Sequence, residues 1–140
     1  MAYSAKADIQ KEISDAELIG LTDDEGLGII NDERITAAIA KADALIDSYI
    51  GSVEETPLTT VAPIIKQHSV TIAIYYLYSR RSAIPESRAQ NYKDAVKNLQ
   101  DIADGKAVLP PTTAGDIASG NEVNITNEDR IFTRTKMKGF

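Results

Sequence analysis

The segment of this sequence that most resembles a chemical site is an acidic loop with the start and length of a calcium-binding loop. Asp23, Glu25 and Gly28 stand at the first, third and sixth positions that an EF-hand loop would use. Leu27, at the fifth position, offers no side-chain oxygen, and Arg34 stands where the bidentate glutamate belongs. We therefore expect a structural loop without a bound metal, with a calcium affinity no tighter than about millimolar.

Catalytic chemistry has little support in the sequence. His68 is the only histidine and there is no cysteine, so the usual zinc ligand sets and cysteine nucleophiles are excluded. The chain also lacks the GxSxG, GxGxxG and GxxxxGK[ST] motifs of hydrolases and nucleotide-binding proteins. We expect no enzymatic activity, no catalytic residues and no cofactor, and we expect His68 to be a hydrogen-bonded interior or boundary group.

Two groups of basic and aromatic residues are candidate binding sites. Tyr78, Arg80 and Arg81 lie at the end of a predicted helix and are a candidate phosphate or partner contact. In the structural alternative, the tyrosines of this region pack and the arginines complement the helix C-terminus. The second group lies in residues 130–140 and consists of the candidate partner-docking residues Arg130, Ile131, Phe132, Arg134, Lys136, Lys138 and Phe140.

Charge is distributed unevenly along the chain, whose net charge is −6. Residues 130–140 hold four basic residues and no acidic one, whereas residues 1–129 hold eleven basic and 21 acidic residues, a net charge of −10. The acidic excess disfavours a protein that wraps duplex DNA by counterion release. The opposite charges predict that the basic segment docks on the acidic body of a neighbouring copy. In the alternative, the segment folds back on its own helices.

Hydrophobic periodicity predicts an all-α protein: a small four- to five-helix bundle with an extended C-terminal arm. We expect helices at about residues 5–13, 14–21, 33–50, 61–80 and 85–104. The β-branched and aromatic run at 70–78 favours a strand, but the unbroken segment around it is too long for one. We therefore expect 61–80 to be the central, most buried helix.

Several helix ends carry recognisable capping residues. Ser14, followed by Glu17, has the pattern of a capping box. Asn31 or Asp32 is expected to cap the helix at 33–50, and Thr60 the helix at 61–80. The helices at 33–50 and 85–104 are each followed by a glycine that suits a C-cap, Gly51 and Gly105.

Composition divides the 140 residues into two parts. After Gly105 the helix formers give way to prolines, threonines and a polar stretch. We predict a helical domain at 1–109 and an extended, partner-docking arm at 110–140. The longest near-apolar run is about half the ~20 residues that a bilayer span needs, so we expect no membrane partner.

Short motifs follow one another in order along nearly the whole chain: 19–28 (IGLTDDEGLG), 42–51 (ADALIDSYIG), 61–66 (VAPIIK), 72–81 (IAIYYLYSRR), 92–95 (YKDA), 99–106 (LQDIADGK) and 130–140 (RIFTRTKMKGF). In this order they resemble the phage Mu-like gene-thirty-six proteins, which are encoded among head and tail genes. Members often carry a fuller Asp-x-Asp-x-Asp-Gly pattern in the acidic loop. Leu27 and Arg34 depart from that pattern.

The resemblance implies a structural virion protein similar to head-to-tail connectors, or neck proteins, which are small helical bundles. It implies a ring between portal and tail, with copies of itself, the portal and tail-completion proteins as partners and DNA only as passing cargo. The location implied is the virion, after assembly in the bacterial host cytoplasm.

Two other functions have some support in the residues. A small helical DNA-binding or regulatory module would use the cluster ending at Arg81 together with the basic tail. A calcium-responsive protein would use the incomplete acidic loop alone. Genome position separates the first alternative from a connector, because a connector gene is expected between capsid and tail genes.

Overall fold

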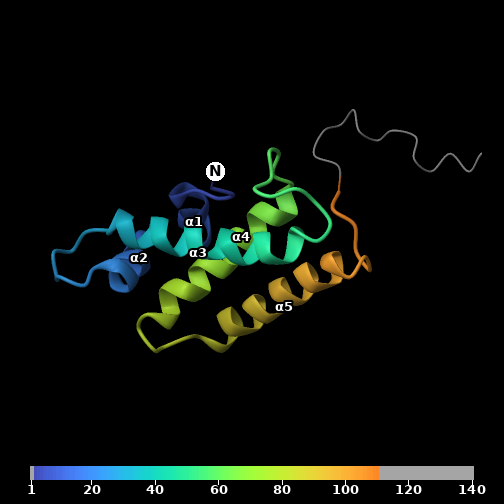
Figure 1. Ribbon diagram of the computed structural model, residues 1–140. Coiled ribbons are helices and arrows are strands. Elements are labelled where there is room, and N and C mark those ends of the chain that lie inside the picture. Colours follow the sequence, from blue (N-terminus) through green and yellow to red (C-terminus); the bar gives the residue numbers. More distant parts are fainter. Residues whose placement is uncertain (1, 111–140) are drawn as a thin grey trace, which may run out of the picture.

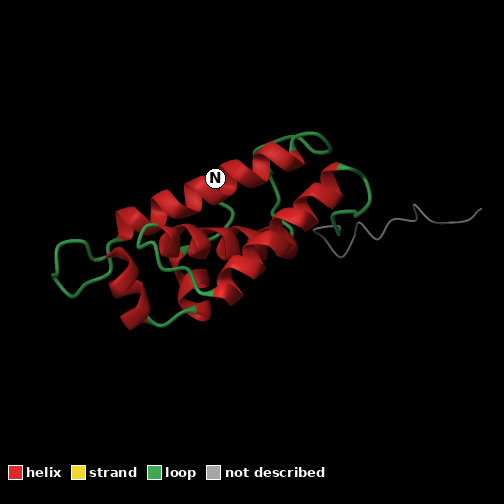
Figure 2. Cartoon of the chain, turned by 90° about the horizontal axis from the view of Figure 1, so that it is seen from below, coloured by secondary structure: helices red, strands yellow, loops and turns green. Residues whose placement is uncertain are grey.

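Five helices make up the regular structure of residues 2–110, the part of the chain that the computed structural model describes (Figures 1 and 2). They are α1 (Lys6–Glu12), α2 (Asp15–Thr22), α3 (Asp32–Ile50), α4 (Pro63–Ser79) and α5 (Glu86–Ala103). The predicted all-α class and helix order are confirmed. The run at 70–78 is helical despite its β-branched residues, because it belongs to a segment whose apolar side chains are buried on several sides.

The three long helices form the centre of the body. α4 packs against both α3 and α5, and α3 also contacts α5. The short helices α1 and α2 each pack against α3 and α4 (Figure 1). The result is an elongated bundle with the α2–α3 loop at one end and the last described residues, after α5, at the other (Figures 1 and 2).

α4 is the central helix, as predicted. Its buried positions occupy more than one face because consecutive residues are enclosed, and they are Ile65, His68, Ser69, Val70, Ile72, Ala73, Ile74, Leu77 and Tyr78. By contrast, α3 and α5 are amphipathic and bury a single stripe each, as their 3–4 spacing predicts. A helix enclosed by its neighbours needs apolar residues on all sides. Such a sequence has no clear helical periodicity, which explains why part of it also resembled a strand.

The predicted caps are partly confirmed. Ser14 accepts a hydrogen bond from the Glu17 N–H at the start of α2, and Asn31 accepts from two N–H groups at the start of α3. The prediction for Thr60 is wrong: the N-cap of α4 is Ala62, which has no side-chain bond. Pro63 takes the first helical position and holds the residue before it in extended backbone, so Thr60 lies outside the helix.

The two glycines that follow helices behave differently. Gly105 has φ of +75°, and the N–H of Lys106 bonds the Asp101 carbonyl at 2.8 Å, as a Schellman ending of α5 requires. Gly51 is the C-cap of α3, but its φ of −58° is right-handed. The predicted C-cap position is therefore confirmed, but no left-handed turn forms there, because the chain continues into a further turn in which the Val53 and Glu54 N–H groups bond the Ile50 carbonyl.

A buried polar network fastens the N-terminal residues to the bundle. The Asp43 carboxylate accepts hydrogen bonds from the Tyr3 N–H at 2.9 Å and the Ser69 hydroxyl at 2.6 Å. The Tyr3 hydroxyl bonds the Asp47 carboxylate and accepts the Leu58 N–H at 2.9 Å. The network joins the N-terminal segment, α3, α4 and the α3–α4 loop. It also supplies hydrogen-bond donors to the carboxylate of Asp43, which is only 8% exposed.

This network predicts a loss of stability at high pH. Burial and the hydrogen bond to Asp47 raise the pKa of Tyr3 to about 12. Since the folded pKa lies above the ordinary value of about 10, Tyr3 contributes fully below about pH 10 and loses its contribution as pH rises to about 12. We expect this loss to reach about 2–3 kcal/mol in the free energy of unfolding, measured by urea denaturation across that range.

Tyr3→Phe is the matched variant for the alkaline prediction. It is less stable at neutral pH because the Leu58 N–H loses its acceptor. Its stability should nevertheless fall less steeply between about pH 10 and 12, because the ionising hydroxyl is gone. A variant with the same alkaline slope as the parent would contradict the assignment.

Of the arm predicted at 110–140, residues 111–140 lie outside the described residues, so the predicted division of the chain stays a prediction. Among the helices of residues 2–110, none combines the length and the apolarity that crossing a membrane requires.

Candidate functional site

The acidic loop between α2 and α3 is built around its own backbone. The Asp23 carboxylate accepts the N–H groups of Leu27 at 3.1 Å and Gly28 at 2.7 Å. Gly26 and Gly28 have φ of +73° and +71°, which lets the chain turn back toward that carboxylate. These N–H donors, Gly28 first, lower the pKa of Asp23 below its usual range. Asp23 therefore closes the loop as a structural acceptor.

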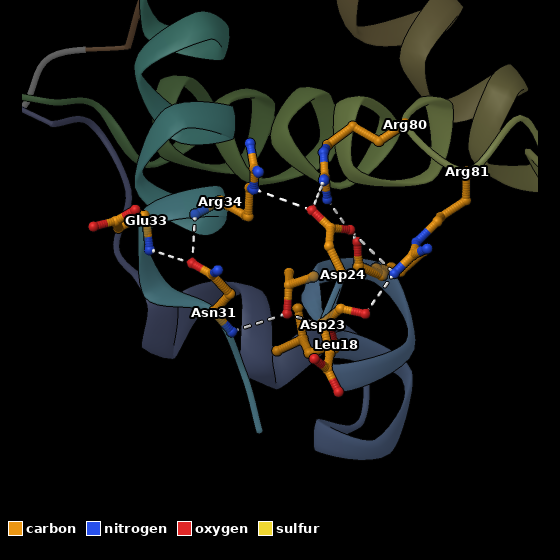
Figure 3. A network of polar contacts seen from close by, with 10 residues as sticks. Leu18, Asp23, Asp24, Asn31, Glu33, Arg34, Arg80 and Arg81 are labelled. Carbon is orange, nitrogen blue, oxygen red and sulfur yellow. Dashed lines mark hydrogen bonds and ion pairs between the residues drawn. The ribbon is translucent and has the colours of Figure 1, made fainter. Parts of the chain in front are cut away.

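Asp24 is the meeting point of three arginines (Figure 3). Its carboxylate lies 3.2 Å from Arg34, 2.5 Å from Arg80 and 3.2 Å from Arg81. Arg34 comes from α3, while the other two follow α4. Arg34, whose position in the loop argued against calcium, is thus the partner of a loop carboxylate.

Tyr78, Arg80 and Arg81, the candidate phosphate contact, do not share one surface. Tyr78 is buried, 7% exposed, in the core. The Arg80 guanidinium also donates to the Leu21 carbonyl at 2.9 Å, and Arg81 donates to the Asp23 carbonyl at 2.8 Å. Both arginines hold the acidic loop against the end of α4, and phosphate contact by them stays a prediction.

The tyrosines of this region pack between helices. Tyr75 of α4 and Tyr92 of α5 are stacked, with ring centroids 3.9 Å apart, and Tyr76 lies beside Tyr92. The Lys41 ammonium lies 5.2 Å from the centre of the Tyr76 ring. Burial, followed by the neighbouring Tyr92, raises the pKa of Tyr76 to about 12. These contacts agree with the structural alternative given above, in which the tyrosines of this region pack between helices.

His68 is buried and hydrogen-bonded, as predicted. Its Nε2 lies 2.8 Å from the Asn98 side-chain oxygen on α5. Within residues 2–110, no three acidic or histidine side chains are grouped as a metal site would need.

The other predicted site residues, Arg130, Ile131, Phe132, Arg134, Lys136, Lys138 and Phe140, lie outside the described residues. Partner docking by them stays a prediction.

Sequence reasoning missed Asp43, the centre of the buried network. A signal was present: Asp43 lies four residues after Ile39 and three before Ile46, on the apolar stripe of α3. An acid at such a position needs a buried partner. The triple pairing of Asp24 had no comparable signal, because Arg80 lies 56 residues away in the sequence.

The described residues therefore define a small all-α protein with an acidic loop that three arginines hold by ion pairs. Comparison with known proteins gives its relatives. Residues 3–127 match the family described as Bacteriophage Mu, Gp36, and the chain belongs to this family.

Two curated relatives come from phage Mu and a prophage like it. The chain is 31% identical over 105 residues to "Gene product J" of Escherichia phage Mu, covering 74% of this chain and 72% of that protein. It is 27% identical over 112 residues to "Mu-like prophage FluMu protein gp36" of Haemophilus influenzae, covering 79% and 78%. The resemblance inferred from the sequence motifs is confirmed at the level of the family.

Proposed function

We propose that this phage-family protein is a head-to-tail connector: a structural virion component that forms a ring between portal and tail. The observation that carries the proposal is the family match over residues 3–127, together with the resemblance of the motif order to proteins encoded among head and tail genes. The all-α body is the architecture expected of such a connector. Its partners would be further copies of itself, the portal and tail-completion proteins.

The surface charge of the body supports DNA as passing cargo. Residues 1–110 contain eleven basic and seventeen acidic residues, a net charge of −6. Among the acidic side chains described, Asp43 alone is buried. Basic side chains favour DNA binding because they release the counterions of the phosphates. A channel with excess negative charge releases none, so DNA would pass without adhering.

The alternative of a DNA-binding module has less support. It uses Arg80 and Arg81, and in the described residues both guanidinium groups are engaged with Asp24 and with backbone carbonyls. Phosphate binding there would have to replace these contacts.

Electron microscopy of phage particles that carry a labelled copy tests the proposal. We expect the label at the neck, in a ring between head and tail. We also expect phage that lack the gene to accumulate filled heads and separate tails, which wild-type protein supplied in trans would join. A label elsewhere in the particle, or normal joining without the gene, would show that the proposal is wrong.

A further inference from the structure

The large apolar side chains exposed within residues 2–110 lie in two pairs. Leu27 and Ile29, 63% and 60% exposed, belong to the α2–α3 loop. Val53 and Val108, 46% and 88% exposed, follow α3 and α5. These segments are at opposite ends of the body (Figures 1 and 2). Neighbouring exposed aliphatic side chains on a protruding loop are typical of an interaction surface.

The pair in the loop lies within an acidic surface. Five acidic and three aliphatic side chains, and no basic one, line a shallow pocket of about 370 Å³ there. We define the acidic-apolar patch as Glu25, Leu27, Ile29, Asp32 and Glu33. Glu25 and Glu33 form no ion pair with any other residue in the range 2–110, whereas Asp32 contacts Lys6 at 2.6 Å.

The arginines near this loop are grouped around Asp24 and not around the patch. Arg34, Arg80 and Arg81 converge on Asp24, where three guanidinium groups meet one carboxylate (Figure 3). None of the three lines the pocket. The patch therefore presents carboxylates beside aliphatic groups, a surface suited to a basic peptide with apolar anchors.

We propose that the acidic-apolar patch binds residues 130–140 of a second copy of this chain. That segment has four basic residues, no acidic residue and four large apolar ones: Ile131, Phe132, Met137 and Phe140. The apolar side chains pack on Leu27 and Ile29, while the basic ones face the carboxylates. The inference rests on the proposed ring and names the surface that joins one copy to the next.

The placement of the two features suits a contact between copies. The described chain ends at the end of the body opposite the patch (Figure 1). Nineteen residues, 111–129, separate Pro110 from the segment, and at about 3.3–3.6 Å per residue they can reach a neighbouring body. A segment delivered from one end to the opposite end of the next copy makes a head-to-tail contact, which a ring requires. Binding to its own patch would instead leave a monomer.

The absence of cysteine allows a direct test by disulfide trapping in the full-length protein. Leu27→Cys and Thr133→Cys are made in separate chains, which keeps Ile29 and every basic and apolar side chain of the segment. Equal amounts are mixed over a concentration series, oxidised and separated on a denaturing gel. We expect disulfide-linked dimers between the two variants to form at least roughly tenfold faster than with the Val53→Cys control, because docking raises the local thiol concentration.

A chain that carries both cysteines distinguishes binding of its own residues 130–140 from binding of the same residues of a second copy. Dimers and longer linked ladders support binding between copies. A fast intrachain disulfide without dimers shows that the segment binds its own body and overturns the proposal. Dimer formation no faster than with Val53→Cys overturns it as well. If the microscopy places the protein at the neck while this disulfide is absent, the connector stands and the patch is wrong.

A second measurement uses non-covalent association. The double variant Leu27→Ser, Ile29→Ser should associate roughly tenfold more weakly in sedimentation, because the anchors lose their apolar contacts. Val53→Ser is the matched control and should associate as the parent does. Both variants change exposed side chains, and unchanged melting temperatures would confirm that they fold. Equal weakening in both, or in neither, would contradict the proposal.

Discussion

Removal of residues 128–140 is expected to abolish assembly into rings or onto heads while the helical body stays folded. The deleted segment contains none of the five helices and none of the buried residues of the described core. It does contain the four basic and four large apolar residues concentrated at the C-terminus. A docking peptide combines such groups, because the apolar side chains supply affinity and the charges guide association.

The measurement combines complementation with folding assays. A phage lacking the gene is supplied with the truncated chain, and plaque formation is compared with that given by the full chain. Circular dichroism and thermal melting of the two purified chains report on the body. Normal complementation by the truncated chain, or melting of the bundle on truncation, would show that the segment is not a docking arm.

Phe132→Ala is the point variant of the same experiment. If Phe132 is a hot spot, its loss costs about 2 kcal/mol or more of association free energy, a drop of roughly thirtyfold in affinity. Thr133→Ala is the matched control, because it shortens a neighbouring side chain without removing a charge or a large apolar group. We expect the control to assemble normally.

Ile72→Asp is expected to unfold the protein. Ile72 is fully buried at the centre of α4, the helix enclosed by α3 and α5. A carboxylate placed there loses its hydration and gains no cation, at a cost of several kcal/mol. Because domains of this kind are stable by only about 5–15 kcal/mol, we expect the loss of cooperative melting and of most helical circular dichroism.

Two companion variants give the scale of the Ile72 effect. Ile72→Val removes one methyl group and should cost about 0.5–1.5 kcal/mol, which locates the site in a packed core even if Ile72→Asp cannot be purified. Gln67→Asp places the same charge at an exposed position of α4 and should cost less than about 1 kcal/mol. A folded Ile72→Asp protein with the parent's melting temperature would contradict the central position of α4.

The helices could be predicted from the sequence because their signals are local. The 3–4 spacing of apolar residues in α3 and α5 and the caps at Ser14 and Asn31 act within a few residues of the backbone that they stabilise. Thr60 was misassigned where two local signals competed, since Pro63 sets the start of α4 and excludes a cap three residues earlier.

The partners of the polar side chains could not be predicted, because they depend on which helices and loops pack together. Nothing in the sequence marked Asp24 as a special residue, yet its carboxylate is the partner of three arginines, two of which follow α4. Tyr3 is hydrogen-bonded to Asp43, Asp47 and Leu58, which lie 40 to 55 positions away in the sequence. Hydrogen bonds and ion pairs act over a few ångströms, so residues distant in sequence meet only after apolar burial has set the helix positions. Hydrophobic periodicity therefore predicted the bundle, but the surface that the acidic loop presents followed from how its helices pack.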